Sequence, residues 1–222
     1  GAIERAYRFG LMLGANGGLR NIPIFDNATS NETGGYHYGW FHFALRDRIR
    51  KANGGSSESM AMWRSVDGNR GRDLFDRWMN AVAADRSNRP AREKVLRARP
   101  AELQDGCFDK ASPSTFVPDA LPFTSAPVSK CSEQYPVYAA PRLVAGGPLA
   151  GDVLKCQLKP IDPKDYQVPL SAPEVSRLRA IFPDGVCDWS MPGVGQVPVA
   201  PWSSLGSSGT NPVAPASTSN AG

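Results

Sequence analysis

The pattern of apolar and polar residues predicts a strand and then a helix near the start of the chain. Residues 19–26 form a short apolar run that Asp26 closes, as is typical of a strand, and Pro23 favours an edge or terminal position for it. A polar, turn-rich segment follows at residues 27–35. A helix is predicted next, because apolar side chains recur at helical spacing at Phe41, Leu45 and Ile49. We expect this helix to end at Ala52-Asn53-Gly54, where glycine supplies a left-handed cap.

Two further helical segments are predicted in the middle of the chain. Residues 72–85 carry an apolar stripe at helical spacing, made of Leu74, Phe75, Trp78, Met79 and Val82. A second helical piece begins at Pro90 and ends before Pro100. Between these helices and the first one, residues 55–59 are predicted to form a surface loop.

The second half of the chain has a different pattern. Residues 106–170 contain many prolines and short apolar runs, which predict irregular structure with short strands. Ser171 and Glu174 then form a capping box, so we expect a helix that Pro183 ends. Helices mixed with short strands predict an α/β class, because an all-α or all-β fold fits this order poorly.

Composition divides the chain into three parts. Gly 22 and Pro 20 together make 42 of 222 residues, so much of the chain must be loop. No charged residue follows Asp188, and from Trp202 onward the sequence is almost entirely small and polar. We therefore predict a core portion at residues 1–105, a Pro-rich extension of the same domain at 106–202, and a flexible tail at 203–222.

Charge and chain ends limit the partners and the cellular location. The net charge of +4 is too small to indicate a nucleic-acid partner, and no apolar run is long enough to span a membrane. Residues 1–6 lack the features of a signal peptide. We expect the chain to be a processed or cut polypeptide, although the break at Gly1 need not be natural.

The cysteines are four in number and stand apart from one another, at Cys107, Cys131, Cys156 and Cys187. No C-x-x-C pair and no nearby histidine is present, so we expect no metal site. An even count in a loop-rich region favours two disulfides in an exported protein, the alternative being four free thiols. Three pairings are possible, and the shortest non-overlapping loops favour Cys107–Cys131 with Cys156–Cys187. Glycosylation sequons start at Asn27 and Asn31.

His37 is the first candidate for chemistry, because it follows the predicted strand at the edge where α/β enzymes keep their sites. His42 is the alternative, although a packing or capping role is favoured for it. Asp26 could orient a histidine, but capping of the next turn is favoured. Tyr36, Tyr38 and Trp40 are candidates for lining a substrate pocket, with ordinary core packing as the other interpretation. No G-x-S-x-G elbow occurs, so a hydrolase would need its nucleophile upstream of residue 1.

Seven stretches of the sequence carry a resemblance to a known family, at residues 18–26, 36–48, 76–85, 141–150, 154–160, 181–190 and 192–195. Through them the chain resembles the C-terminal half of an exported bacterial family of unknown function that is related to α/β-hydrolases. The family pattern has an acidic residue where this chain has Tyr36.

The resemblance implies the C-terminal part of an α/β-hydrolase-like fold with a helical, disulfide-bonded and loop-rich extension. It implies a secreted or periplasmic serine hydrolase without a cofactor, most simply an esterase rather than an amidase, acting on a small or polymeric ester. His37 would be its general base, and the nucleophile and oxyanion donors would lie on a polypeptide before Gly1. Two alternatives stay open: one half of a processed heterodimer, and an inactive extracellular binding or structural module.

Overall fold

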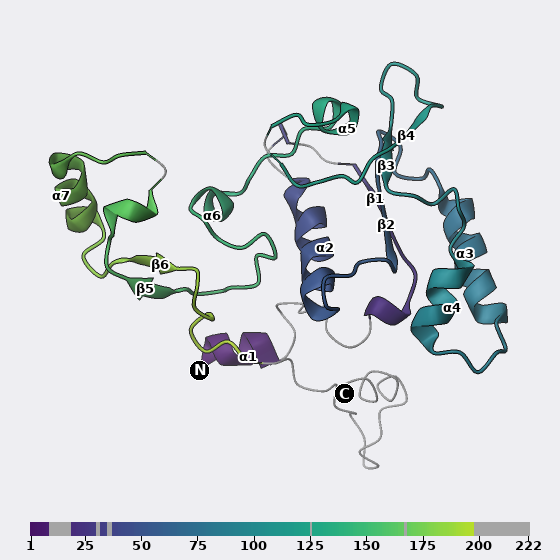
Figure 1. Cartoon of the computed structure of the whole chain (residues 1–222), viewed down its shortest axis with the longest axis horizontal. Coiled ribbons are helices and arrows are strands. Elements are labelled where there is room, and N and C mark those ends of the chain that lie inside the picture. Colours follow the sequence, from purple (N-terminus) through teal and green to yellow (C-terminus); the bar gives the residue numbers. More distant parts are fainter. Residues whose placement is uncertain (9–18, 30–31, 35–36, 125, 167, 198–222) are drawn as a thin grey trace, which may run out of the picture.

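The computed structural model describes residues 1–8, 19–29, 32–34, 37–124, 126–166 and 168–197 (Figure 1). Tyr36, the sequon residue Asn31 and the tail predicted at 203–222 lie outside the described residues. The fold is of mixed α/β class, which confirms the class predicted from the sequence.

A four-stranded sheet forms the centre of the molecule, with the strand order β1-β2-β3-β4. Its strands are β1 (Ile24–Ala28), β2 (Met60–Arg64), β3 (Gly106–Phe108) and β4 (Phe116–Pro118). The first three strands run parallel, and β4 is antiparallel to β3. In the part of the chain that the structure describes, β1 is an edge strand, as Pro23 predicts.

Strand β2 is a central element that the sequence pattern does not reveal. All five of its residues are buried, and β1 and β3 pair with it on either side. A central strand covered on both faces lacks polar–apolar alternation, and Met60-Ala61-Met62 has none of the β-branched residues that mark most strands. The surface loop predicted at residues 55–59 therefore leads directly into the middle of the sheet.

Helices cover both faces of this sheet (Figure 1). Helix α2 (Trp40–Ala52) covers one face, where Phe43 and Ile49 pack in one cluster with Met60 and Met62. Helices α3 (Arg72–Ala84) and α4 (Ala91–Ala98) cover the other face. The buried residues of that side are Ala61, Trp78, Val95 and Leu103. These helices match the segments predicted from apolar periodicity.

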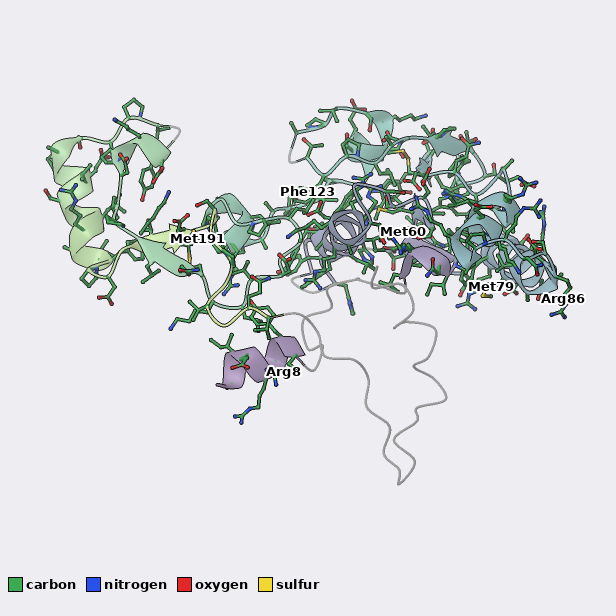
Figure 2. All side chains as sticks on the ribbon, turned by 60° about the horizontal axis from the view of Figure 1, so that its bottom comes forward. Arg8, Met60, Met79, Arg86, Phe123 and Met191 are labelled. Carbon is green, nitrogen blue, oxygen red and sulfur yellow. A yellow bond between two sulfur atoms is a disulfide. The ribbon has the colours of Figure 1, made fainter. Side chains whose placement is uncertain are left out.

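The extension starts within the sheet and continues into a small lobe (Figures 1 and 2). It contains β3 and β4, then α5 (Lys130–Gln134) and α6 (Pro141–Val144). The small lobe, which carries Met191 in Figure 2, is built on an antiparallel pair of β5 (Gln157–Lys159) and β6 (Val186–Asp188). Its helix α7 (Ala172–Ile181) begins at the predicted capping box. The remaining elements are α1 (Ala2–Arg8) and the 3-10 turns η1 (Leu19–Asn21) and η2 (Pro163–Asp165).

Two disulfides staple the extension, and both pairings agree with the shortest-loop prediction. Cys107 of β3 is bonded to Cys131 of α5, with Cα atoms 5.6 Å apart. Cys156 is bonded to Cys187 of β6, with Cα atoms 5.4 Å apart. The first bridge ties the extension to the central sheet, and the second ties the small lobe to itself. Among the helices of the described segments, none is long and apolar enough to cross a membrane.

The first predicted glycosylation sequon lies inside a hydrogen-bond network. The Asn27 side-chain Nδ2 donates to the carbonyl oxygens of Asp67 and Arg70, each at 2.9 Å. Its Oδ1 accepts from the hydroxyl of Ser65 at 3.1 Å. Nδ2 is the atom to which a glycan would be attached. In this fold Asn27 therefore connects β1 to the loop that follows β2.

Candidate functional site

Asp26 and His42 meet at the boundary between the sheet and α2. Asp26 is in β1, on the same side of the strand as Ile24, which packs against the core under α2. His42 is the third residue of α2. Its Nδ1 lies 2.9 Å from Oδ2 of Asp26, with the two side chains 30% and 11% exposed. The aspartate is thus largely buried, whereas the imidazole still reaches the surface.

This contact fixes which ring nitrogen is available for chemistry. A carboxylate accepts hydrogen bonds, so Nδ1 of His42 is the nitrogen that donates to Asp26. In the neutral imidazole Nε2 then carries the lone pair and can take up a proton. A carboxylate in this position holds the tautomer and stabilises the imidazolium that forms.

The role favoured for Asp26 from the sequence is wrong. Asp26 does not close its strand, because β1 continues to Ala28, and its carboxylate accepts from His42 rather than capping the next turn. The packing or capping role favoured for His42 likewise did not include its hydrogen bond to Asp26. The two residues are 16 positions apart, and helical or strand periodicity carries no information about such a contact.

His37, ranked first from the sequence, occupies a different position. It is exposed, lies on the loop before α2 and has a φ of 55°, in the left-handed region. Asp26 is brought together with the alternative, His42, which is five residues further along the chain. Folding of residues 40–52 into a helix carries the second imidazole over β1.

Aromatic side chains flank His42 in sequence and form a stacked pair. The Trp40 and Phe41 rings lie with centroids 4.0 Å apart and planes at 27°. Phe41 is 56% exposed, whereas Trp40 and Tyr38 are half-buried. Trp40 also packs against the core, so it has the structural role that was the alternative to substrate binding.

Arg64, at the carboxyl end of β2, is a charged residue that the sequence analysis does not identify. It is 1% exposed, and burial lowers the pKa of its guanidinium, while the charges of Asp26 and Glu32 oppose that shift. The guanidinium also lies over the ring of Phe43, 5.9 Å from its centroid. A buried cation beside two carboxylates makes this end of the sheet strongly polar.

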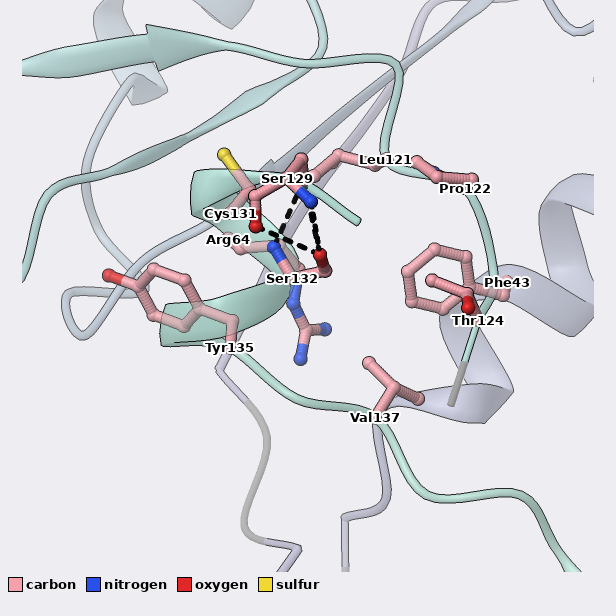
Figure 3. Close-up of a pocket in the computed structure, with 10 residues that line it drawn as sticks. All are labelled: Phe43, Arg64, Leu121, Pro122, Thr124, Ser129, Cys131, Ser132, Tyr135 and Val137. Carbon is pink, nitrogen blue, oxygen red and sulfur yellow. Dashed lines mark hydrogen bonds between the residues drawn. The ribbon is translucent and has the colours of Figure 1, made fainter. Parts of the chain in front are cut away.

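A cavity of about 20 Å³ adjoins the Arg64 side chain (Figure 3). Figure 3 shows the guanidinium between Tyr135, Ser132 and Val137. The other lining residues are Phe43, Leu121, Pro122, Thr124, Ser129 and Cys131. A volume of this size holds about one water molecule and no ester substrate. Residues 121–124 and 129–137 of the extension thus supply most of the lining of the cavity beside Arg64.

Metal ligands do not gather in this region. In the segments that the structure describes, no group of three or more His, Cys, Asp or Glu side chains could hold a metal ion.

Comparison with known proteins places the chain in a family. A family model, the Tannase-like family of unknown function (DUF6351), matches residues 1–198. The chain belongs to this family. The description of the family likens it to tannase, which is a carboxylic ester hydrolase. No curated protein and no solved structure matches the chain.

Proposed function

We propose that the chain is part of a serine hydrolase that cleaves carboxylic esters, with His42 as general base and Asp26 as its orienting carboxylate. The observation that carries the proposal is the 2.9 Å contact between His42 Nδ1, in the first turn of α2, and Asp26 Oδ2, in the middle of the parallel strand β1. Membership in a Tannase-like family favours ester chemistry over amide chemistry. The same sheet, covered by helices on both faces, is consistent with the C-terminal part of an α/β-hydrolase-like fold.

In the proposed mechanism the nucleophile is a serine on polypeptide that precedes residue 1. His42 Nε2 takes the proton from the serine Oγ as that oxygen attacks the ester carbonyl carbon. The tetrahedral intermediate collapses when the imidazolium returns the proton to the leaving oxygen, which gives an alcohol and an acyl-serine. Water then repeats the sequence and releases the acid. Asp26 stays ionised throughout and holds the imidazolium in place.

The surface around His42 supports this arrangement. Phe41, the residue before His42 in α2, is 56% exposed and stacks on Trp40, so it presents an apolar ring face at the surface. Such a face suits either the substrate or the polypeptide that brings the nucleophile. Two disulfides favour a secreted or periplasmic setting, where such bonds persist.

Kinetics of the protein that includes the polypeptide before residue 1 test the proposal. With p-nitrophenyl acetate as the ester, His42→Ala and Asp26→Asn are each expected to lower kcat/KM by about 10²–10⁴-fold. His37→Ala is expected to retain activity within about threefold, because surface substitutions away from the chemistry have small effects. A large loss in His37→Ala with none in His42→Ala would transfer the role to His37 and overturn the assignment.

A fluorophosphonate probe tests the origin of the nucleophile. Mass spectrometry is expected to locate the label on a serine outside residues 1–222 in the wild-type protein. His42→Ala should greatly slow this labelling, since the base that activates the serine is gone. A label on a serine within the chain would contradict the upstream nucleophile. Absence of both labelling and ester hydrolysis would leave the binding or structural module as the better account.

A further inference from the structure

Glu32 contacts the beginning of the helix that carries His42. Gly39 is the N-cap residue of α2 and has no side chain with which to cap it. Its N–H donates instead to Oε1 of Glu32 at 2.6 Å. A carboxylate at a helix N-terminus is stabilised by the helix dipole and by the free N–H groups there. Glu32 therefore supplies a bond to the first turn of α2 from outside the helix.

The same carboxylate also reaches the extension. Oε2 of Glu32 accepts a hydrogen bond from the backbone N–H of Tyr138 at 3.3 Å, across 106 positions of sequence. Tyr138 follows Val137, which lines the cavity beside Arg64. One side chain thus links the loop after β1, the first turn of α2 and the disulfide-stapled extension.

Arg64 completes this cluster from the sheet side. A Cβ atom placed on Gly39 would lie 2.7 Å from Glu32 Oε1 and 2.9 Å from Arg64 Nη2. The carboxylate and the guanidinium therefore both press against the Gly39 backbone, and their charges attract. A side chain at position 39 would therefore have to displace the end of Glu32 or of Arg64.

His42 lies one turn away from this cluster. Its backbone N–H donates to the Gly39 carbonyl at 3.1 Å, so a shift of Gly39 would carry the imidazole with it. Arg64 of β2 pairs with Ala28 of β1, and Ala28 lies two residues after Asp26 on that strand. The cluster thus ties the helix that holds the histidine to the strands that hold the aspartate.

We infer that Glu32 is a positioning residue that, together with Arg64 and Gly39, holds His42 within hydrogen-bond distance of Asp26. The inference rests on the proposed function for its catalytic meaning, but the geometry it describes is independent of the nucleophile. A displacement of about 1 Å is enough to impair a catalytic hydrogen bond. The extension, through Tyr138, is then a working part of the site.

Proton NMR of the His42 ring tests the inference without any activity assay. In the wild-type protein we expect a downfield Nδ1–H resonance, and Asp26→Asn should remove or displace it and so identify it. Glu32→Gln keeps the shape but removes the charge that faces Arg64 and the α2 N-terminus. Exchange of the ring proton with water is expected to accelerate at least about tenfold, the factor that corresponds to loss of a charge-assisted hydrogen bond.

Glu58→Gln is the matched control, because Glu58 pairs with Arg92 at the opposite end of β2 and is 62% exposed. It should leave the His42 resonance unchanged. Gly39→Ala is a second variant and should broaden or abolish the resonance, because its methyl group displaces Glu32 or Arg64.

Three outcomes would overturn the inference: no downfield resonance in the wild type, an unchanged resonance in Glu32→Gln, or an equal change in Glu58→Gln. A lower melting temperature with an unchanged resonance would show a structural role alone. If the resonance responds as expected while His42→Ala keeps full esterase activity, the positioning stands and the proposed function fails.

Discussion

Asp109 shows how single charges fasten the extension to the sheet. It follows β3, and its carboxylate accepts a hydrogen bond from the Lys130 ammonium at the start of α5. Its Oδ1 also accepts from the backbone N–H of Ala111 at 2.9 Å. The lysine contact, followed by this backbone bond, lowers the pKa of the Asp109 carboxyl below its usual value. The ion pair lies next to the Cys107–Cys131 bridge in sequence and reinforces it.

Asp109→Asn is expected to lower the melting temperature by a few degrees at pH 7. A carboxyl group whose pKa is lowered in the folded state adds stability above its unfolded value of about 3.9. That contribution disappears as the pH falls through the folded-state value. The difference between wild type and variant should therefore shrink as the pH falls below that folded-state value. Thermal unfolding followed by circular dichroism measures it, with the exposed Asp76→Asn on α3 as control. A difference in melting temperature that persists at low pH would show that the charge of Asp109 is not its cause.

At the residue scale, the sequence identified Asp26 and the two histidines as candidates, but it did not predict which histidine contacts Asp26. Asp26 and both histidines are recognisable from their residue types and their place after an apolar run. Which histidine meets Asp26 depends on where α2 begins, and Gly39 offers no side-chain cap that would mark that start. Glu32 and Arg64 are missed because their contacts join distant segments, and no local spacing encodes them.

At the scale of the elements, the pairing of β3 with β4 depends on one glycine, Gly106. Gly106 begins β3, pairs with Pro118 of β4 and is buried. A Cβ atom there would overlap the Val117 carbonyl oxygen and would lie 2.6 Å from the Phe116 ring. The antiparallel pair can approach this closely only because position 106 has no side chain.

Gly106→Ala is therefore expected to destabilise the fold by about 1–3 kcal/mol, the usual cost of overpacking a buried site. Gly68→Ala is the matched control, since its nearest neighbouring atom would be 3.9 Å away and its φ is not in the left-handed range. Urea unfolding of both variants gives the free energies. Equal stabilities for the two variants would show that β4 moves away at no cost.

The elements differ in how visible they are in the sequence. Helices α2, α3 and α7 are predicted because periodicity, glycine caps and a capping box act within a few residues. Strand β2 was not predicted, because burial on both faces removes the alternation of polar and apolar residues. The short strands of the extension are expected only in general terms, since three residues contain too little pattern to set a register.

At the scale of the whole molecule, the two disulfides stabilise different parts of the fold, the central core and the small lobe. Cys107 and Cys131 are 0% and 1% exposed and belong to the core cluster that lies beneath α2. Cys156 and Cys187 connect β5 with β6 in the small lobe. That lobe joins the rest through contacts such as the Leu154 N–H donating to the Tyr7 hydroxyl at 2.6 Å. The bridges close loops of similar separation, 24 and 31 residues, so chain entropy alone gives them similar strength.

Their removal should nevertheless have different consequences for the site. The double variant Cys107→Ala/Cys131→Ala is expected to lose about 3 kcal/mol of global stability, and hydrogen exchange should accelerate in β2, β3 and α2 together. The double variant Cys156→Ala/Cys187→Ala should accelerate exchange in α7, β5 and β6 while α2 and the His42 ring resonance stay as in the wild type. Exchange mass spectrometry on both proteins measures this. If the Cys156→Ala/Cys187→Ala variant instead lost protection from hydrogen exchange throughout the central sheet, the sheet would depend on a disulfide that lies outside it. The small lobe would then be an integral part of the core.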